Sequence, residues 1–284
     1  MTKSSEMEPI KISIDDYVLA GGGANGESYN HRKDPSVMLK LYFPGMINQP
    51  LDEMLLARKV YDLGVPTPEP GDYVVTEDGR YGIRFRRIVG KTSFARACGD
   101  HPEKVAEYAV DFAVMCKHLH AVHVNMSEFE SVKVRYLRLL GESPYFTPRE
   151  KDRLSRFIID APDSDTALHG DLHFGNAIFV GGEKYFIDLG DFGYGHPYFD
   201  LGMLYLCCKL SGEEFNKEYL HVDNATASAF WDAFVPEYFG TDLTMEEVDR
   251  LILPYAALKT IMIDRDCGCR RKEFHDVIDR VFFG

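Results

Sequence analysis

A stretch near the middle of the chain gathers short polar side chains in front of an apolar run. Residues 168–179 read LHGDLHFGNAIF, in which Asp171 and Asn176 lie five positions apart. A carboxylate can accept the proton of a hydroxyl group, and an amide oxygen can bind a hard cation such as Mg²⁺. Transfer of a phosphoryl group uses an Asp and an Asn at this spacing as base and metal ligand. The stretch therefore predicts phosphoryl transfer, with Asp171 as the base and Asn176 as a metal ligand.

A second candidate metal ligand follows a few residues later. The segment NAIFVGGEKYFIDLGD contains two apolar runs around Gly181 and Gly182, and Asp188 ends the second run. The sequence Asp-Leu-Gly occupies the place of the metal-binding Asp-Phe-Gly of protein kinases. We expect the two runs to form a hairpin that carries the polar groups to the floor of a cleft. Taken singly, each Asp or Asn could instead cap a turn.

The N-terminal region contains a glycine turn. The segment YVLAGGGANGESYN reads as strand, turn and strand, and Gly21, Gly23 and Gly26 fit the pattern G-x-G-x-x-G. Glycine lets backbone N–H groups approach phosphates because no Cβ stands in the way. A dinucleotide-binding fold requires a helix after this turn, whereas a second strand is expected here. The pattern indicates the phosphate cover of protein kinases, although a glycine-rich hairpin turn without a ligand has the same letters.

A lysine lies on the next expected strand. The segment SVMLKLYF is β-branched and apolar around Lys40, whose ammonium group could hold the α- and β-phosphates of a nucleotide. A carboxylate near the start of the following helix should orient this lysine, and Glu53 fits best, with Asp52 as the fallback. The alternatives are an exposed strand lysine and acidic residues that compensate the helix dipole. The joint order of all four patterns favours the kinase interpretation.

These motifs resemble the aminoglycoside phosphotransferase family, within the choline-kinase and protein-kinase-like superfamily. The resemblance runs from about Gly21 to Leu201 and is carried by HGDLHFGN, IDLGD, GYG and YFDL, the last of which contains Asp200. It implies a bilobal α+β kinase fold, ATP or sometimes GTP, Mg²⁺, and transfer to a hydroxyl group of a small molecule. The helices expected after Leu201 contain no motif that matches the family.

The resemblance also implies roles for individual residues. Asp171 would be the base, Asn176 and Asp188 the metal ligands, and Lys40 a phosphate ligand. The hinge between the lobes, at 86–89 with Arg87 and Ile88, would pair with the nucleobase through its backbone. The sequence departs from the family at Ser28, where kinases usually have Val, and at His196, where many relatives have an acidic residue.

Length and hydrophobic patterning predict two lobes. The chain has 284 residues, which favours more than one core. Residues 1–90 alternate short β-rich pieces with glycine turns and one helix, so we expect a small nucleotide-binding lobe there. Residues 91–284 are mostly helical, with helices expected near 102–124, 132–140 and 148–159, and should form the catalytic and substrate-binding lobe.

Composition limits the partners. The net charge is −13, which argues against a nucleic-acid partner because phosphate backbones require a basic face. The same charge favours a cationic acceptor, although excess acid can also serve solubility alone. The polar start MTKSSEMEPIKISIDD and the lack of a long apolar run predict a cytoplasmic chain without a signal peptide or membrane partner. Nothing in the sequence indicates an oligomeric state.

The remaining polar clusters have structural explanations. Six cysteines form no C-x-x-C pair, so we expect reduced thiols. His118, His120 and His123 lie at a helix end, where imidazoles more often cap or pack than bind metal. The single tryptophan, Trp231, is expected to pack in the core.

The sequence leaves four functions open. The short loop between Asp188 and the expected helix at Tyr198 offers no platform for a peptide, so a small acceptor is favoured over a protein substrate. The acceptor could be cationic, as in aminoglycosides or amino alcohols, or it could be a neutral sugar or alcohol. The chain could also be a nucleotide-binding regulator without turnover, or a glycine-turn protein that binds no nucleotide.

Overall fold

The computed structural model describes residues 7–22, 26–45 and 48–284. The chain divides into two compact units. Unit 1 consists of residues 1–91 together with 178–190, and unit 2 consists of residues 92–177 together with 191–284. The segment 178–190 groups with unit 1, where Phe186 donates a backbone hydrogen bond to the carbonyl of Pro66 at 2.8 Å. The sequence analysis assigns this segment to the second lobe, since chain order alone cannot reveal such a return.

Unit 1 is built on a six-stranded sheet with the order β1-β5-β6-β4-β3-β2. All neighbouring strands are antiparallel except β1 and β5, which are parallel. The strands on either side of the glycine motif, β2 and β3, pair antiparallel as expected. Another hairpin joins β5 and β6 at Gly79, whose φ of 82° suits a turn. The strands are β1 (Ile10–Ile12), β2 (Tyr17–Gly22), β3 (Gly26–His31), β4 (Val37–Tyr42), β5 (Pro70–Thr76) and β6 (Tyr81–Arg86), with a 3₁₀ turn at Ile14–Asp16.

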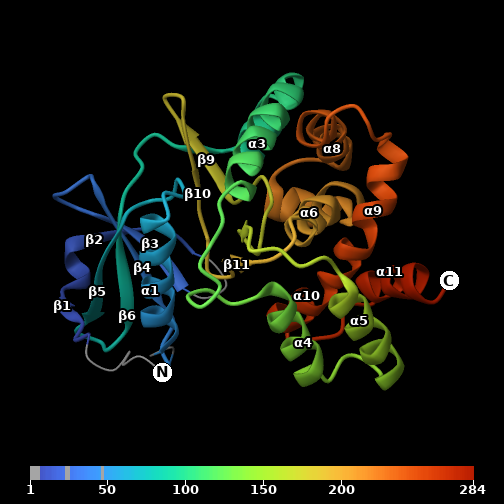
Figure 1. The fold of residues 1–284 in the computed structure, drawn as a ribbon. Helices are drawn as coiled ribbons and strands as arrows, with labels where there is room; N and C mark the ends of the chain where they lie inside the picture. The colour runs from blue at the N-terminus through green and yellow to red at the C-terminus, as the bar shows by residue number, and fades with distance from the viewer. Residues whose placement is uncertain (1–6, 23–25, 46–47) are drawn as a thin grey trace. The chain divides into compact units, whose positions relative to one another are not determined.

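One helix packs on this sheet. Helix α1 (Asn48–Asp62) contacts β5 and β6 and buries Met54 against Tyr73 and Ile83 (Figure 1). The helix ends before Gly64, whose φ of 80° is the left-handed conformation that glycine favours after a helix. Strands β9 (Ala177–Val180) and β10 (Glu183–Phe186) form the expected second glycine hairpin.

Unit 2 is mainly helical (Figure 1). The helices predicted near 132–140 and 148–159 are confirmed, and a capping box between Thr147 and Glu150 starts the second of them. Two short strands, β8 and β11, pair antiparallel. The elements are β7 (Thr92–Ser93), α2 (Phe94–Asp100), α3 (Val105–His120), α4 (Val132–Glu142), α5 (Pro148–Asp160), β8 (Ala167–Leu168), β11 (Gly193–Tyr194), α6 (Tyr198–Tyr205), α7 (Glu213–Phe215), α8 (Asn224–Phe239), α9 (Met245–Leu258), α10 (Thr260–Cys267) and α11 (Lys272–Phe282), with a 3₁₀ turn at Pro102–Lys104 and π-helical turns at Leu206–Leu210 and Asn216–Leu220.

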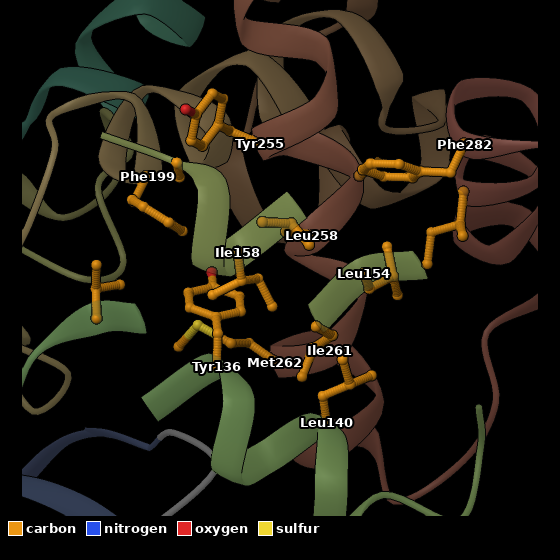
Figure 2. Close-up of a cluster of buried hydrophobic side chains, with 14 of the residues drawn as sticks. Tyr136, Leu140, Leu154, Ile158, Phe199, Tyr255, Leu258, Ile261, Met262 and Phe282 are labelled. Atoms are coloured by element: carbon orange, nitrogen blue, oxygen red, sulfur yellow. The ribbon is translucent and has the colours of Figure 1, made fainter. Parts of the chain in front are cut away.

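The core of unit 2 includes a cluster that joins distant parts of the chain. Side chains of α4 and α5 meet side chains of α9, α10 and α11 around Tyr136 and Leu258, as Figure 2 shows. Trp231 is fully buried and stacks on Phe234, so its expected packing role is confirmed. These contacts fix the C-terminal helices against the rest of unit 2.

Candidate active site

The loop after β8 brings together the two residues singled out by their spacing. The side-chain amide of Asn176 donates to the backbone oxygen and to Oδ2 of Asp171, both at 3.0 Å. The backbone N–H of Asn176 closes the turn by donating to the carbonyl of His173 at 2.9 Å. In the described part of the chain nothing donates to Oδ1 of Asn176. The loop therefore presents the Asp171 carboxylate, which is about one-third exposed, beside a carbonyl oxygen.

A buried carboxylate on α6 holds the start of this loop. Both oxygens of Asp200 accept backbone hydrogen bonds, from His169 at 2.7 Å and from Gly170 at 2.8 Å. His120 adds a contact to Asp200 at 3.2 Å and bonds Tyr238 with its other ring nitrogen. Burial raises the pKa of Asp200, but the hydrogen bond and charge of His120 and the charge of Lys259 outweigh burial and keep that pKa below its usual value. Asp200 therefore remains a carboxylate.

The three clustered histidines have separate surroundings. His120 serves Asp200, His123 bonds Asp165 at 2.7 Å on the surface, and His118 is exposed. Within the described ranges no group of three His, Cys, Asp or Glu side chains could hold a metal ion. The contacts of His120 and His123 are the packing and capping roles that the sequence analysis favours for this cluster.

Strand β4 of unit 1 presents Lys40 to two carboxylates. Its Nζ atom donates to Glu53 on α1 at 2.6 Å and lies 3.7 Å from Asp188. Asp52, the alternative partner, is exposed. The side chain of Lys40 is about one-quarter exposed, so the ion pairs hold the ammonium group in one direction without removing it from solvent.

Asp188 itself has an unusual backbone conformation. It follows β10 with a φ of 59°, in the left-handed region that non-glycine residues seldom occupy. Its side chain is 61% exposed, although it faces the Lys40 ammonium group. Backbone strain of this kind concentrates at functional sites, where the surrounding structure must maintain it.

The glycine turn is only partly described. Gly21 is paired with Ser28 in the β2–β3 hairpin, and the Ser28 hydroxyl donates to the carbonyl of Gly21 at 3.4 Å. Gly26 has a packing reason of its own, because a Cβ there would come within 2.3 Å of the Leu41 carbonyl oxygen. Gly23 lies outside the described residues. Gly26 of the glycine motif therefore has a strand-packing role.

The segment predicted to pair with a nucleobase, residues 86–89, begins at the end of β6. The backbone N–H of Arg87 donates to the carbonyl of Ser36 at 2.6 Å, so this donor is already used inside unit 1. The next residue, Ile88, lies outside any helix or strand. A nucleobase could therefore be met by the Arg87 carbonyl or by the backbone of Ile88, but not by the Arg87 N–H in this arrangement.

Two cations of the C-terminal segment bond residues near the predicted site, and sequence reasoning missed both. Lys259 donates to the carbonyl of Gly170 at 3.0 Å, and Arg265 binds the Asp191 carboxylate at 3.2 and 3.3 Å. Burial raises the pKa of Asp191, but the hydrogen bond and charge of Arg265 outweigh it and lower that pKa. Both partners are more than seventy residues away in the chain, so no local pattern could have revealed them.

The predicted metal ligands carry the donor atoms that a hard divalent cation prefers. Asp171, Asn176 and Asp188 offer only carboxylate and amide oxygens, and Mg²⁺ prefers such ligands to nitrogen or sulfur. The Asp188 side chain is 61% exposed, so an ion in solvent can reach its carboxylate. The chemistry of the donor set is therefore consistent with magnesium.

Comparison with known proteins assigns the chain to a family. The model of the phosphotransferase enzyme family matches residues 17–234, and the chain belongs to this family. The resemblance drawn from the motifs is thereby confirmed. No curated protein sequence matches the chain significantly. The described residues contain no helix whose length and apolar character would allow it to cross a membrane.

Solved structures share the fold. The amicoumacin kinase hAmiN, solved with AMP-PNP and Ca²⁺, is 16% identical, with a TM-score of 0.58 over 96% of this chain and 90% of that one. The aminoglycoside phosphotransferase APH(4)-Ia is 13% identical, with a TM-score of 0.63 over 95% and 96%. A choline/ethanolamine kinase family protein from Mesorhizobium loti is 17% identical, with a TM-score of 0.56 over 94% and 85%. The predicted α+β, protein-kinase-like fold is confirmed.

Proposed function

We propose that the protein transfers the γ-phosphate of ATP to a hydroxyl group of a small molecule. The observation that carries the proposal is the contact of Asn176 with Asp171, which sets a base beside an amide oxygen on one anchored loop. Membership of the phosphotransferase enzyme family supports the reaction class. GTP is an alternative donor.

On this proposal one residue transfers a proton, and three others bind the metal ion and the nucleotide phosphates. Asp171 accepts the proton of the acceptor hydroxyl and aligns its oxygen for attack on the γ-phosphate. Asn176 and Asp188 would hold Mg²⁺, which supplies neutralisation of the charge on the β- and γ-phosphates. Lys40, oriented by Glu53 at 2.6 Å, binds the α- and β-phosphates.

The remaining predicted residues would bind the nucleotide. Backbone groups of the glycine turn, at Gly21, Gly23 and Gly26, cover the phosphates. The Arg87 carbonyl and the backbone of Ile88 pair with the base edge. On this assignment residues 1–90 serve nucleotide binding, and residues 91–284 serve catalysis and acceptor binding. A cytoplasmic location stays a prediction from the sequence.

The acceptor is proposed to be small and cationic. A loop of nine residues separates Asp188 from α6, which leaves little surface for a peptide. The net charge of −13 favours a cation through the summed field. The Asp191 carboxylate is already paired with Arg265, so this residue contributes less to such attraction than its charge alone suggests. Related folds include an amicoumacin kinase and a complex with hygromycin B.

A phosphate-transfer screen tests the proposal. Purified protein with Mg-ATP is assayed for ADP and phosphorylated product against aminoglycosides, choline-like amines, amino alcohols and neutral sugars. We expect transfer to at least one amine-bearing alcohol, and Asp171→Asn should reduce kcat by about a thousandfold because the general base is lost. Nucleotide binding by this variant, measured by calorimetry, should persist.

Any different result of the screen points to a different function. Turnover of neutral sugars alone would replace the cationic acceptor. Nucleotide binding without transfer to any acceptor would instead indicate a regulator. A chain whose thermal unfolding does not respond to Mg-ATP would not be a nucleotide-binding protein, since binding to the native state raises its stability.

A further inference from the structure

Lys259 is a charged side chain in the interior of unit 2. The residue lies between α9 and α10 and is only 1% exposed, which places it among the largest fully buried side chains of the described chain. Removing an ammonium group from water is costly unless partners compensate it. The buried position of Lys259 therefore requires a specific reason.

The surroundings of Lys259 keep it charged. Its Nζ atom donates to the carbonyl of Gly170 at 3.0 Å and lies 5.6 Å from the centre of the Tyr136 ring. Burial lowers the pKa of Lys259, but the interaction with Tyr136 and the carboxylates of Asp200 and Asp171 outweigh burial and raise that pKa. The ammonium group thus bonds the loop backbone beside two carboxylates.

Gly170 is constrained from several directions. It has a φ of 89°, and a Cβ at this position would come within 1.9 Å of the Asp191 carbonyl oxygen. Its N–H group bonds Asp200, while its carbonyl bonds Lys259. The Asp200 carboxylate therefore holds the N–H of Gly170 and the Lys259 ammonium group holds its carbonyl, directly before Asp171.

Lys259 bonds the carbonyl of the peptide group that joins Gly170 to Asp171. The carbonyl of Gly170 and the N–H of Asp171 belong to the same planar unit, so fixing the carbonyl fixes the plane. The N–H of that unit also bonds Nδ1 of His169 at 3.3 Å. The direction in which the Asp171 side chain leaves the backbone depends on this plane.

We propose that Lys259 is a positioning residue, which holds the Gly170–Asp171 peptide group so that Asp171 keeps its orientation toward the acceptor hydroxyl. The catalytic part of this inference rests on the proposed function. Lys259 lies beyond residues 17–234, the part of the chain that matches the family model. On this inference Lys259 affects the reaction through the backbone of Gly170.

The test compares two lysines that each bond a backbone carbonyl. Lys259→Met removes the bond to Gly170. The control Lys133→Met removes a bond to the carbonyl of Ile159 at 3.0 Å, together with an ion pair to Asp163. Hydrogen exchange of peptides covering 166–176 is measured for both variants and for the wild type. Steady-state phosphate transfer is then measured with the acceptor found in the screen.

We expect local and specific effects from Lys259→Met. Amides of 169–176 should exchange about tenfold faster while the rest of unit 2 keeps its protection, because only this loop loses a bond. The kcat value should fall by about a hundredfold with an unchanged KM for ATP, as expected for a misdirected catalytic group. Lys133→Met should change neither the exchange of amides 169–176 nor kcat. Lys259→Arg keeps a cationic donor, so its kcat and loop protection should lie between those of Lys259→Met and the wild type.

Several outcomes would overturn the inference. Unchanged exchange in the loop, or faster exchange throughout unit 2, would leave Lys259 with no positioning role. Faster exchange in the loop together with a wild-type kcat would show that Lys259 holds the loop but that this does not affect catalysis. If Lys259→Met does not fold, Lys259→Arg is compared with the wild type instead. Its partial loss should speed exchange in 169–176 alone, and faster exchange throughout unit 2 would contradict the proposal. A wild type inactive on every acceptor refutes the proposed function, whereas the exchange result still decides whether Lys259 holds the loop.

Discussion

At the level of single residues, Asp200 shows how a buried charge can be stable. Its carboxylate is fully buried, and it is compensated by two backbone N–H groups and by His120. Each of these donors would be left without an acceptor if the carboxylate were removed. Leaving a buried donor unpaired costs more free energy than an average hydrogen bond contributes. Asp200 should therefore contribute strongly to the stability of the loop.

Asp200→Asn is therefore expected to lower the free energy of unfolding by about 3 kcal/mol at pH 7. The folded-state pKa of Asp200 is depressed below the unfolded value, which is about 3.9. Its stabilisation is thus present above about pH 4 and is lost as the pH falls through the folded pKa. Urea unfolding of wild type and variant should show a difference that shrinks in strongly acidic buffer.

An exposed aspartate of the same unit serves as the control. Asp232 pairs with Lys209 at 2.7 Å, but its side chain is about half exposed. Asp232→Asn should change stability by about 0.5 kcal/mol or less, as surface pairs generally do. If both variants lost stability equally, burial would not be the source of the Asp200 effect.

The contacts of individual residues differ in how far they could be predicted from the sequence. The contact between Asp171 and Asn176 could be anticipated because the two residues lie five positions apart within one loop. Glu53 could only be preferred to Asp52, since the register at the start of a helix is not fixed by adjacent acidic letters. Lys259 could not be found, because its bond to Gly170 spans 89 positions and depends on tertiary packing.

At the level of elements, the β3–β4 pair depends on a close approach of two backbones. Gly26 is paired with Tyr42, and a Cβ at Gly26 would meet the Leu41 carbonyl oxygen at 2.3 Å. Real Cβ atoms do not come so close to backbone oxygen, so β3 would have to move away from β4. The same strand β4 carries Lys40, which makes its placement important for the proposed nucleotide site.

Gly26→Ala should therefore destabilise unit 1 by about 2 kcal/mol through overpacking. Gly22→Ala is the matched control in the same hairpin, because a Cβ there meets nothing within 4 Å. Thermal unfolding followed by circular dichroism compares the two variants. Equal unfolding temperatures for both variants would mean that β3 tolerates a side chain at position 26 as well as β2 does at position 22.

Hairpins and helices with local stop signals were predictable. The β5–β6 hairpin turns at Gly79, and α1 ends before Gly64, both with positive φ. Strand β1 was not predicted, because it is short and pairs in parallel with β5, from Ile10 to Val74. Such a pairing depends on a chain reversal far away in sequence, which periodicity does not report.

At the level of the whole molecule, the family match and the folding unit do not coincide. The match ends at residue 234, whereas the cluster in Figure 2 continues through α11. Eight of its seventeen buried side chains belong to α9, α10 and α11. They are Tyr255, Ala257, Leu258, Ile261, Met262, Val277, Ile278 and Phe282.

A chain that ends at Gly240 should consequently fail to fold. Losing one large buried side chain costs about 2–5 kcal/mol, and the total stability of a domain is only about 5–15 kcal/mol. Trp231, the single tryptophan, provides the readout, because its indole N–H donates to Asp249 of α9 at 2.8 Å. In the truncated chain its fluorescence should shift to the red, with loss of the near-ultraviolet dichroism.

Phe282→Ala in the full-length chain separates truncation from a simple loss of stability. This variant should lower the free energy of unfolding by about 3 kcal/mol and keep the blue emission of a buried Trp231. A truncated chain with native emission would show that residues 1–240 fold independently. In that case the C-terminal helices would be dispensable for the fold, and the proposed positioning role of Lys259 would be the remaining function assigned to them.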